Sequence, residues 1–158
     1  MKGFTNKIAV ITGAGSGIGR SLALSLVEQG AQLALSDIDA AAVTETARRC
    51  AMIGTKAMAF ELDVARRATV YSHAQDVVRE FGGANLIFNN AGVALSAEVA
   101  DIEWDDFEWL MGINFWGGGP LHEGFSAAPD RVRRWPHRQR LLGVRTPRCP
   151  VAKCLQSC

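Results

Sequence analysis

The chain has 158 residues, of which 48% are hydrophobic and 21% are charged, and its formal net charge is +1. This length is typical of one domain, and this composition is typical of a water-soluble globular protein. A charge so close to neutral gives no support to a nucleic-acid or membrane partner, so we expect neither. Cys50 is the only cysteine before residue 149, and no apolar run is long enough to cross a membrane, so we expect reduced thiols and a cytoplasmic location.

Short apolar runs alternate with amphipathic stretches along the first three quarters of the chain. Nearly continuous, β-branched runs predict buried strands at 7–12, 32–36, 56–62 and 85–88. Apolar residues at helical spacing predict helices over about 18–29, 40–52, 68–81 and 101–116. Strands that alternate with helices in this way imply right-handed crossovers and a parallel sheet. We therefore predict an α/β protein with a Rossmann-type doubly wound sheet, truncated after the fourth strand and the helix that follows it.

A glycine-rich loop joins the first predicted strand to the first predicted helix. Glycine permits positive φ angles and lets the backbone approach a phosphate without a Cβ atom in the way. The helix that follows directs its unpaired N–H groups and positive dipole end to the same point. A turn without a ligand is the alternative, but the strand, the helix and a downstream acid together favour a pyrophosphate site. The candidate residues are Gly13, Ser16, Gly17, Ile18 and Gly19.

Asp37 follows the second predicted strand and can accept two hydrogen bonds from a ribose diol. The carboxylate would repel a 2′-phosphate, and Ser16 and Ile38 stand where a phosphate-binding base could have been. This pattern favours NAD over NADP as the cofactor, whereas the alternative for Asp37 is a helix cap or a solvated carboxylate. After the third strand, Asp63 could bond the adenine amine with Val64 beside the ring, and a capping role explains Asp63 equally well.

The order and spacing of these motifs resemble the short-chain dehydrogenase/reductase family over about residues 5–117. The resemblance rests on residues 12–19, on Asp37 and Asp63, on Asn-Asn-Ala-Gly at 89–92, and on Asn114. It implies an oxidoreductase that moves a hydride between NAD and the hydroxyl or carbonyl carbon of a small alcohol or carbonyl substrate. It also implies a homo-oligomer.

The same resemblance assigns roles to residues that the spacing alone leaves open. It implies that Asn90, Ala91 and Gly92 line the ribose side of the cofactor and brace the sheet. It also implies a catalytic role for Asn114, whose backbone would position a water molecule in a proton relay. Taken without the family, Asn114 would be interpreted as an amide on a helix surface.

The chain departs from the family's pattern where the remaining catalytic groups are expected. The family uses a Ser and a Tyr-x-x-x-Lys pair. Here the only tyrosine is Tyr71, which precedes the fourth predicted strand, and Gln75 stands four residues after it. The last lysine, Lys153, has Cys149 four residues before it. We therefore predict that this chain is inactive as written, and the alternative is a non-catalytic dinucleotide-binding or interaction module.

The composition changes near residue 117. Residues 117–158 hold eight basic and two acidic residues, all five prolines and three of the four cysteines. Gly117-Gly118-Gly119-Pro120 is expected to break the preceding helix. We predict an NAD-binding domain at 1–117 and a basic, Pro/Arg/Cys-rich tail at 118–158, disordered or frame-shifted. The tail's arginines match no nucleic-acid module and its cysteines do not have zinc-knuckle spacing, so no metal site is expected.

A shifted reading frame is our hypothesis for the origin of the tail. When each codon is read one base later, the genetic code permits Ala-Ser-Ser-Val-Phe-Gly in place of residues 140–145. It likewise permits Ser-Ala-Tyr-Asn in place of residues 153–156. These strings resemble the family's fifth strand with its catalytic Ser and the approach to its catalytic Tyr. A stop codon or unrelated sequence in that frame of the coding DNA would contradict the hypothesis.

Overall fold

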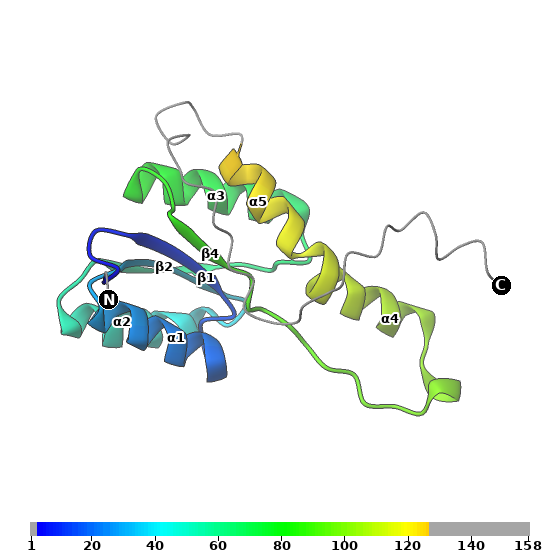
Figure 1. Cartoon of the computed structure of the whole chain (residues 1–158). Helices are drawn as coiled ribbons and strands as arrows, with labels where there is room; N and C mark the ends of the chain where they lie inside the picture. Colours follow the sequence, from blue (N-terminus) through cyan, green and yellow to red (C-terminus); the bar gives the residue numbers. More distant parts are fainter. Residues whose placement is uncertain (1–2, 127–158) are drawn as a thin grey trace.

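The computed structural model of the chain describes residues 3–126, and its centre is a four-stranded parallel sheet (Figure 1). The strands are β1 (Ile8–Thr12), β2 (Gln32–Asp37), β3 (Ala57–Glu61) and β4 (Leu86–Phe88). Their spatial order is β3-β2-β1-β4, and each neighbouring pair is parallel. The predicted fold class is confirmed, and every strand ends within one residue of its predicted position.

Helices cover both faces of the sheet, as a doubly wound fold requires. They are α1 (Gly17–Glu28), α2 (Ala40–Ile53), α3 (Arg67–Phe81), α4 (Trp104–Met111) and α5 (Gly118–Ser126), with a 3-10 turn at Val99–Asp101 and a π-helical segment at Gly112–Trp116. In Figure 1, α1 and α2 lie on one face, and α3 and α5 lie on the other. Within residues 3–126, no helix is both long and apolar enough to span a bilayer.

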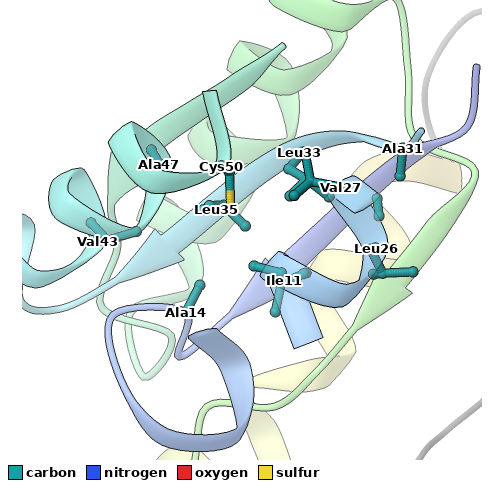
Figure 2. Close-up of a cluster of buried hydrophobic side chains, with 12 residues drawn as sticks. Ile11, Ala14, Leu26, Val27, Ala31, Leu33, Leu35, Val43, Ala47 and Cys50 are labelled. Atoms are coloured by element: carbon teal, nitrogen blue, oxygen red, sulfur yellow. The ribbon is translucent and has the colours of Figure 1, made fainter. Parts of the chain in front are cut away.

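The two central strands are buried on both faces, which explains why their sequences are apolar without alternation. Ile11 and Leu35 pack against α1 and α2, whereas Val10, between two such positions, packs against α3 and α5. All three side chains are fully buried. Figure 2 shows the first of these clusters, in which the Cys50 side chain of α2 reaches the sheet. Burial raises the pKa of the Cys50 thiol.

The predicted helix break at Gly117–Pro120 is wrong. Gly117 has right-handed helical angles (φ −60°, ψ −30°), and α5 begins at the next residue. Pro120 lies in the first turn of α5, where a missing N–H group removes no hydrogen bond of that helix. Leu121 and Phe125, which are 0% and 5% exposed, fix α5 against α3 by burying apolar surface.

Close packing also explains the glycine at the start of this segment. A Cβ atom at Gly117 would lie 3.1 Å from a methyl carbon of Val64 and 2.6 Å from the Ile113 carbonyl oxygen. Glycine therefore lets the helix approach the turn that follows β3. The predicted domain boundary at 117 falls inside a helical segment, and residues 127–158 of the predicted tail lie outside the described part of the chain.

Candidate functional site

A cleft lies at the carboxyl ends of the strands, where the strand order reverses. From β1 the chain continues to β2 on one side, and it later returns to β4 on the other. Such switch points are the usual ligand sites of open parallel sheets, because the loops on either side diverge there. The cleft measures about 350 Å3. Its lining residues are Gly13, Ser16, Gly17, Ile18, Asp37, Ile38, Leu62, Asp63, Val64, Asn90, Ala91, Gly92, Val93 and Ile113.

The structure thus brings together all of the predicted cofactor residues except Gly19. Three apolar lining residues, Leu62, Val93 and Ile113, were missed by the sequence analysis. Each is adjacent to a predicted residue: Leu62 precedes Asp63, Val93 follows Gly92, and Ile113 precedes Asn114. Their apolar character carries no signal beyond that adjacency, so the sequence could not separate them from ordinary core residues.

Glycines in the loop after β1 are required by positive φ angles and by close approach. Gly13 and Gly17 have φ angles of +65° and +50°. At Gly13, a Cβ atom would also lie 2.9 Å from the Cα atom of Ala91. Gly19 lies behind the lining, where a Cβ atom would stand 2.1 Å from the Gly13 carbonyl oxygen. Gly19 therefore allows α1 to pack directly against the loop, and its predicted contact with a cofactor stays a prediction.

The start of α1 opens into the same cleft. Ser16 is the N-cap residue, and its side chain makes no hydrogen bond to the first turn. The Ser16 carbonyl accepts its helical bond from the Arg20 N–H at 3.1 Å, so the amides of Gly17 and Ile18 precede the first such bond. Uncapped amides at the positive end of a helix dipole suit an anion. A phosphate group fits this part of the cleft.

Hydrogen bonds tie the ends of β1 and β4 together. The Thr12 hydroxyl accepts the N–H groups of Asn90 and Ala91 at 3.1 and 3.0 Å. In return, the Asn90 side-chain amide donates to the carbonyls of Thr12 and Gly13 at 3.1 and 3.2 Å. These bonds fix the two loops that flank the switch point, and they agree with the bracing role expected of Asn90.

Asp37 stands at the carboxyl end of β2, half-buried in the cleft wall. Its Oδ2 accepts the Gly15 N–H at 2.8 Å, and its Oδ1 accepts the Asp39 N–H at 3.0 Å. A carboxylate has about four lone-pair sites. The Asp37 carboxylate therefore keeps lone pairs that can accept hydrogen bonds from a diol. The two bonds from backbone N–H groups fix the orientation of the carboxylate.

Asp63 also combines a local role with a place in the cleft. Its Oδ1 accepts the Ala65 N–H at 2.9 Å, and its Oδ2 lies 3.9 Å from Nε of Arg66. The Asp63 carboxylate therefore caps the turn before α3, whose own N-cap residue is Arg66, and its predicted bond to an adenine amine stays a prediction. Neighbouring Val64 is 9% exposed and forms an apolar wall of the cleft. An aromatic base fits an apolar wall beside a carboxylate.

Asn114 lies in the π-helical segment rather than in the cleft lining. Its Oδ1 accepts the Val93 N–H, and its Nδ2 donates to the Val93 carbonyl, both at 2.8 Å. The side chain is exposed, yet it pairs with both polar groups of one residue in the loop after β4. Asn114 thus joins the helix to that loop, and its predicted role in a proton relay stays a prediction.

Tyr71 lies on α3, outside the cleft lining. Its hydroxyl accepts from Nη2 of Arg67 at 2.9 Å and also bonds to the Glu123 carboxylate.

None of the cleft-lining residues is basic. In the described part of the chain, no group of three or more His, Cys, Asp or Glu side chains could hold a metal ion.

A doubly wound sheet with a glycine loop, an uncapped helix start and an acid at the end of β2 defines a dinucleotide-binding fold of the Rossmann type. The sequence model of the short chain dehydrogenase family matches residues 7–121. The chain therefore belongs to the short-chain dehydrogenase/reductase family, whose members are oxidoreductases.

Individual relatives agree with the family assignment. The chain is 46% identical over 117 residues to SadH of Mycobacterium tuberculosis, covering 74% of this chain and 42% of the relative. It is 34% identical over 119 residues to mouse estradiol 17-beta-dehydrogenase 11, covering 73% of this chain and 40% of the relative. The chain therefore spans about two fifths of the length of these relatives.

Solved structures share the arrangement of the sheet and helices. A short chain dehydrogenase/reductase from Burkholderia phymatum in complex with NAD superposes with a TM-score of 0.76 at 34% identity, over 80% of this chain and 45% of that one. NAD+-bound xylitol dehydrogenase superposes with a TM-score of 0.74 at 34% identity, over 78% of this chain and 48% of that one.

Proposed function

We propose that the chain carries the NAD-binding half of a short-chain dehydrogenase/reductase. The observation that carries the proposal is the cleft at the switch point, which combines the uncapped start of α1 with the Asp37 carboxylate. In this assignment the amides of Gly17 and Ile18 hold the pyrophosphate and Asp37 holds the adenosine ribose. Val64 and Asp63 border the adenine, and Ala91 and Gly92 face the second ribose. When bound, NAD supplies the hydride acceptor.

NAD is favoured over NADP because a 2′-phosphate beside Asp37 would meet a fixed negative charge and no basic side chain in the cleft lining. Titration of the full chain with NADH and NADPH, followed by cofactor fluorescence, tests this preference. We expect NADH to bind more tightly, by about tenfold or more for one lost charge-assisted interaction. Asp37→Ser should weaken NADH and reduce the difference between the two cofactors. Equal affinity of the unmodified chain for NADH and NADPH would contradict the assignment.

The proposed reaction of the intact family member is hydride transfer at a hydroxyl or carbonyl carbon of a small molecule. The sequence contains no Tyr-x-x-x-Lys pair to move the proton on the substrate oxygen, and we infer that the catalytic Ser is missing as well, so we expect no turnover from this chain as written. An assay over primary and secondary alcohols with NAD, run on this chain and on its frame-restored version, tests both parts. Activity of the restored version alone is the expected result. A homo-oligomeric state and a cytoplasmic location remain part of the proposal.

A non-catalytic dinucleotide-binding module is the second candidate. The position of Tyr71 favours it, because its hydroxyl bonds to Arg67 and Glu123, and none of these three residues lines the cleft. This candidate predicts that this chain binds NADH without turnover. It also predicts that the alternative reading frame of the coding DNA does not encode the rest of the family's sequence. The coding sequence therefore separates the two candidates.

A further inference from the structure

Arg20 lies on α1 just behind the cleft and bonds to the glycine loop. Its Nη2 donates to the Gly15 carbonyl, and its Nε donates to the Thr46 hydroxyl of α2 at 3.0 Å. Thr46 is fully buried, and Arg20 is partly buried. A guanidinium bonded at both of these nitrogens is held in one orientation, because its fork of donors is rigid. Arg20 therefore links the loop to α2.

The same glycine is bonded on its other side by the candidate ribose-binding acid. The Gly15 N–H donates to Oδ2 of Asp37 at 2.8 Å, so both backbone polar groups of Gly15 have side-chain partners. There is little space for the carboxylate to move toward the loop. A Cβ atom placed at Gly15 would lie 2.9 Å from Cγ and Oδ2 of Asp37 and 3.0 Å from Cβ of Ala42.

The remaining bonds close a circuit around Asp37. Its Oδ1 accepts the Asp39 N–H at 3.0 Å, and the Asp39 side chain caps α2 by accepting the Ala42 N–H at 2.9 Å. The Thr46 hydroxyl donates to the Ala42 carbonyl at 3.1 Å and accepts from Arg20. Hydrogen bonds at the start of α2 thus connect Arg20 to Asp37. The Gly15 peptide connects Asp37 back to Arg20.

We propose that Arg20 is a positioning residue, which fixes the Asp37 carboxylate through Gly15 and Thr46 and thereby sets the affinity for the adenosine ribose of NAD. The inference rests on the proposed function. Arg20 itself does not line the cleft, so it acts by fixing the orientation of the Asp37 carboxylate. Without Arg20, the Gly15 carbonyl loses its side-chain partner, and the loop and the carboxylate bonded to it can turn away from the diol.

The binding experiment compares two ligands on matched variants of the full chain. Arg20→Met removes both donors, Thr46→Val removes the α2 anchor, and Arg79→Met is the control, because Arg79 is an exposed arginine on α3. The ligands are NADH and its analogue in which the adenosine ribose lacks both hydroxyls. We expect Arg20→Met to weaken NADH about tenfold, the effect of one mispositioned charge-assisted bond, and to change the analogue less than about twofold. Thr46→Val should act in the same direction with a smaller effect, and Arg79→Met should leave both ligands unchanged.

Amide hydrogen exchange without ligand gives a second, independent measurement. Faster exchange of the Gly15 amide in Arg20→Met, with unchanged exchange in β1 and β2, is expected if Arg20 holds the loop. Equal weakening of both ligands would reveal a merely structural role and overturn the proposal, as would unchanged NADH affinity or unchanged Gly15 exchange. If the unmodified chain failed to bind NADH at all, the proposed function would fall. The Gly15 exchange rate would still decide whether Arg20 anchors the loop.

Discussion

The sheet around β1 and β2 and the helix α4 are both rich in large apolar side chains, yet they differ completely in burial. Leu33 and Leu35 of β2 are fully buried against α1 and α2. Trp104, Phe107 and Trp109 of α4 are 70%, 45% and 48% exposed, and α4 has no buried residue. In Figure 1, α4 projects away from the sheet at the end of a long loop.

The comparison shows that the two regions are stabilised by different interactions. The sheet region is held by apolar surface removed from water, which contributes about 25 cal/mol per Å2. Local interactions support α4: acidic residues Asp105 and Asp106 lie in its first turn, where the helix dipole favours them. In addition, Nε1 of Trp104 donates to the Glu108 carboxylate one turn later at 3.0 Å.

The largest difference between the two regions is expected when one apolar side chain is truncated in each of them. Leu35→Ala leaves a cavity in the sheet core and should lower the free energy of unfolding by about 3 kcal/mol. Trp104→Ala removes an exposed side chain and should change it by about 0.5 kcal/mol or less. Urea unfolding followed by far-UV circular dichroism measures both, because no tryptophan lies in the sheet. Equal losses from the two variants would show that α4 is as cooperatively packed as the sheet.

We expect the sheet region, and not α4, to lose stability as the pH falls. His73 of α3 is 3% exposed and packs edge-on against Phe60, and burial lowers the pKa of its imidazole to about 4 from an ordinary 6.5, with Asp76 opposing the shift. The folded state then disfavours the imidazolium. The stabilising contribution is complete above pH 6.5 and is lost progressively as the pH falls to about 4.

The amount lost between these pH values is of the order of 3 kcal/mol. His73→Phe should remove this part of the pH dependence when urea unfolding is compared at pH 7.5, 5.5 and 4.5. Because each comparison is made against the unmodified chain, His122 and His137 contribute equally to both proteins. An unchanged pH dependence in His73→Phe would contradict the effect assigned to burial.

A smaller effect is expected where the two regions meet. Asn114→Leu removes both hydrogen bonds to Val93 and should destabilise the loop after β4 by about 1 kcal/mol. The amide of Val93 should exchange faster, while amides of β1 keep their protection. Asn114→Asp keeps the acceptor and loses the donor. Its Val93 exchange rate should therefore lie between those of the unmodified chain and Asn114→Leu. No change in the exchange of Val93 would mean that the loop is held by other contacts.

The smallest effect is expected in α4 alone. Asp105→Asn removes one charge from the start of the helix and should cost about 0.5 kcal/mol or less, decreasing with added salt. The helical signal of α4 at low and high salt measures it. Glu80 lies in the last turn of α3, where the helix dipole disfavours a negative charge. Glu80→Gln therefore serves as the matched control and should stabilise its helix slightly, whereas Asp105→Asn destabilises α4. The same sign for both substitutions would count against a dipole effect.

Much of the fold and of the candidate site could be predicted because the relevant signals are local. An apolar run such as residues 8–11 indicates a strand buried on both faces, and Gly13 and Gly17 indicate a loop with positive φ angles. Asp37 was recognisable because it follows the second predicted strand, downstream of the glycine loop, where dinucleotide-binding folds place a ribose-binding acid. Those features depend on neighbours in sequence and on general rules for parallel sheets.

The features that the sequence could not supply all depend on contacts between distant segments. Nothing local marks Leu62 or Ile113 as cleft residues, since each is one apolar position among many. The helix across Gly117 was predicted to break because glycine and proline are poor helix formers. Burial of Leu121 and Phe125 against α3 outweighs that local preference.

The sequence by itself determined the order of strands and helices, the glycine loop and the acid that faces it, because backbone preferences and apolar periodicity act over a few residues. Only the tertiary structure decided that Arg20 bonds to Gly15, that Asn114 pairs with Val93, and that the Tyr71 hydroxyl bonds to Glu123 of α5. These choices depend on which segments the packed sheet brings side by side, and the free energy that selects them is burial and hydrogen bonding across those segments.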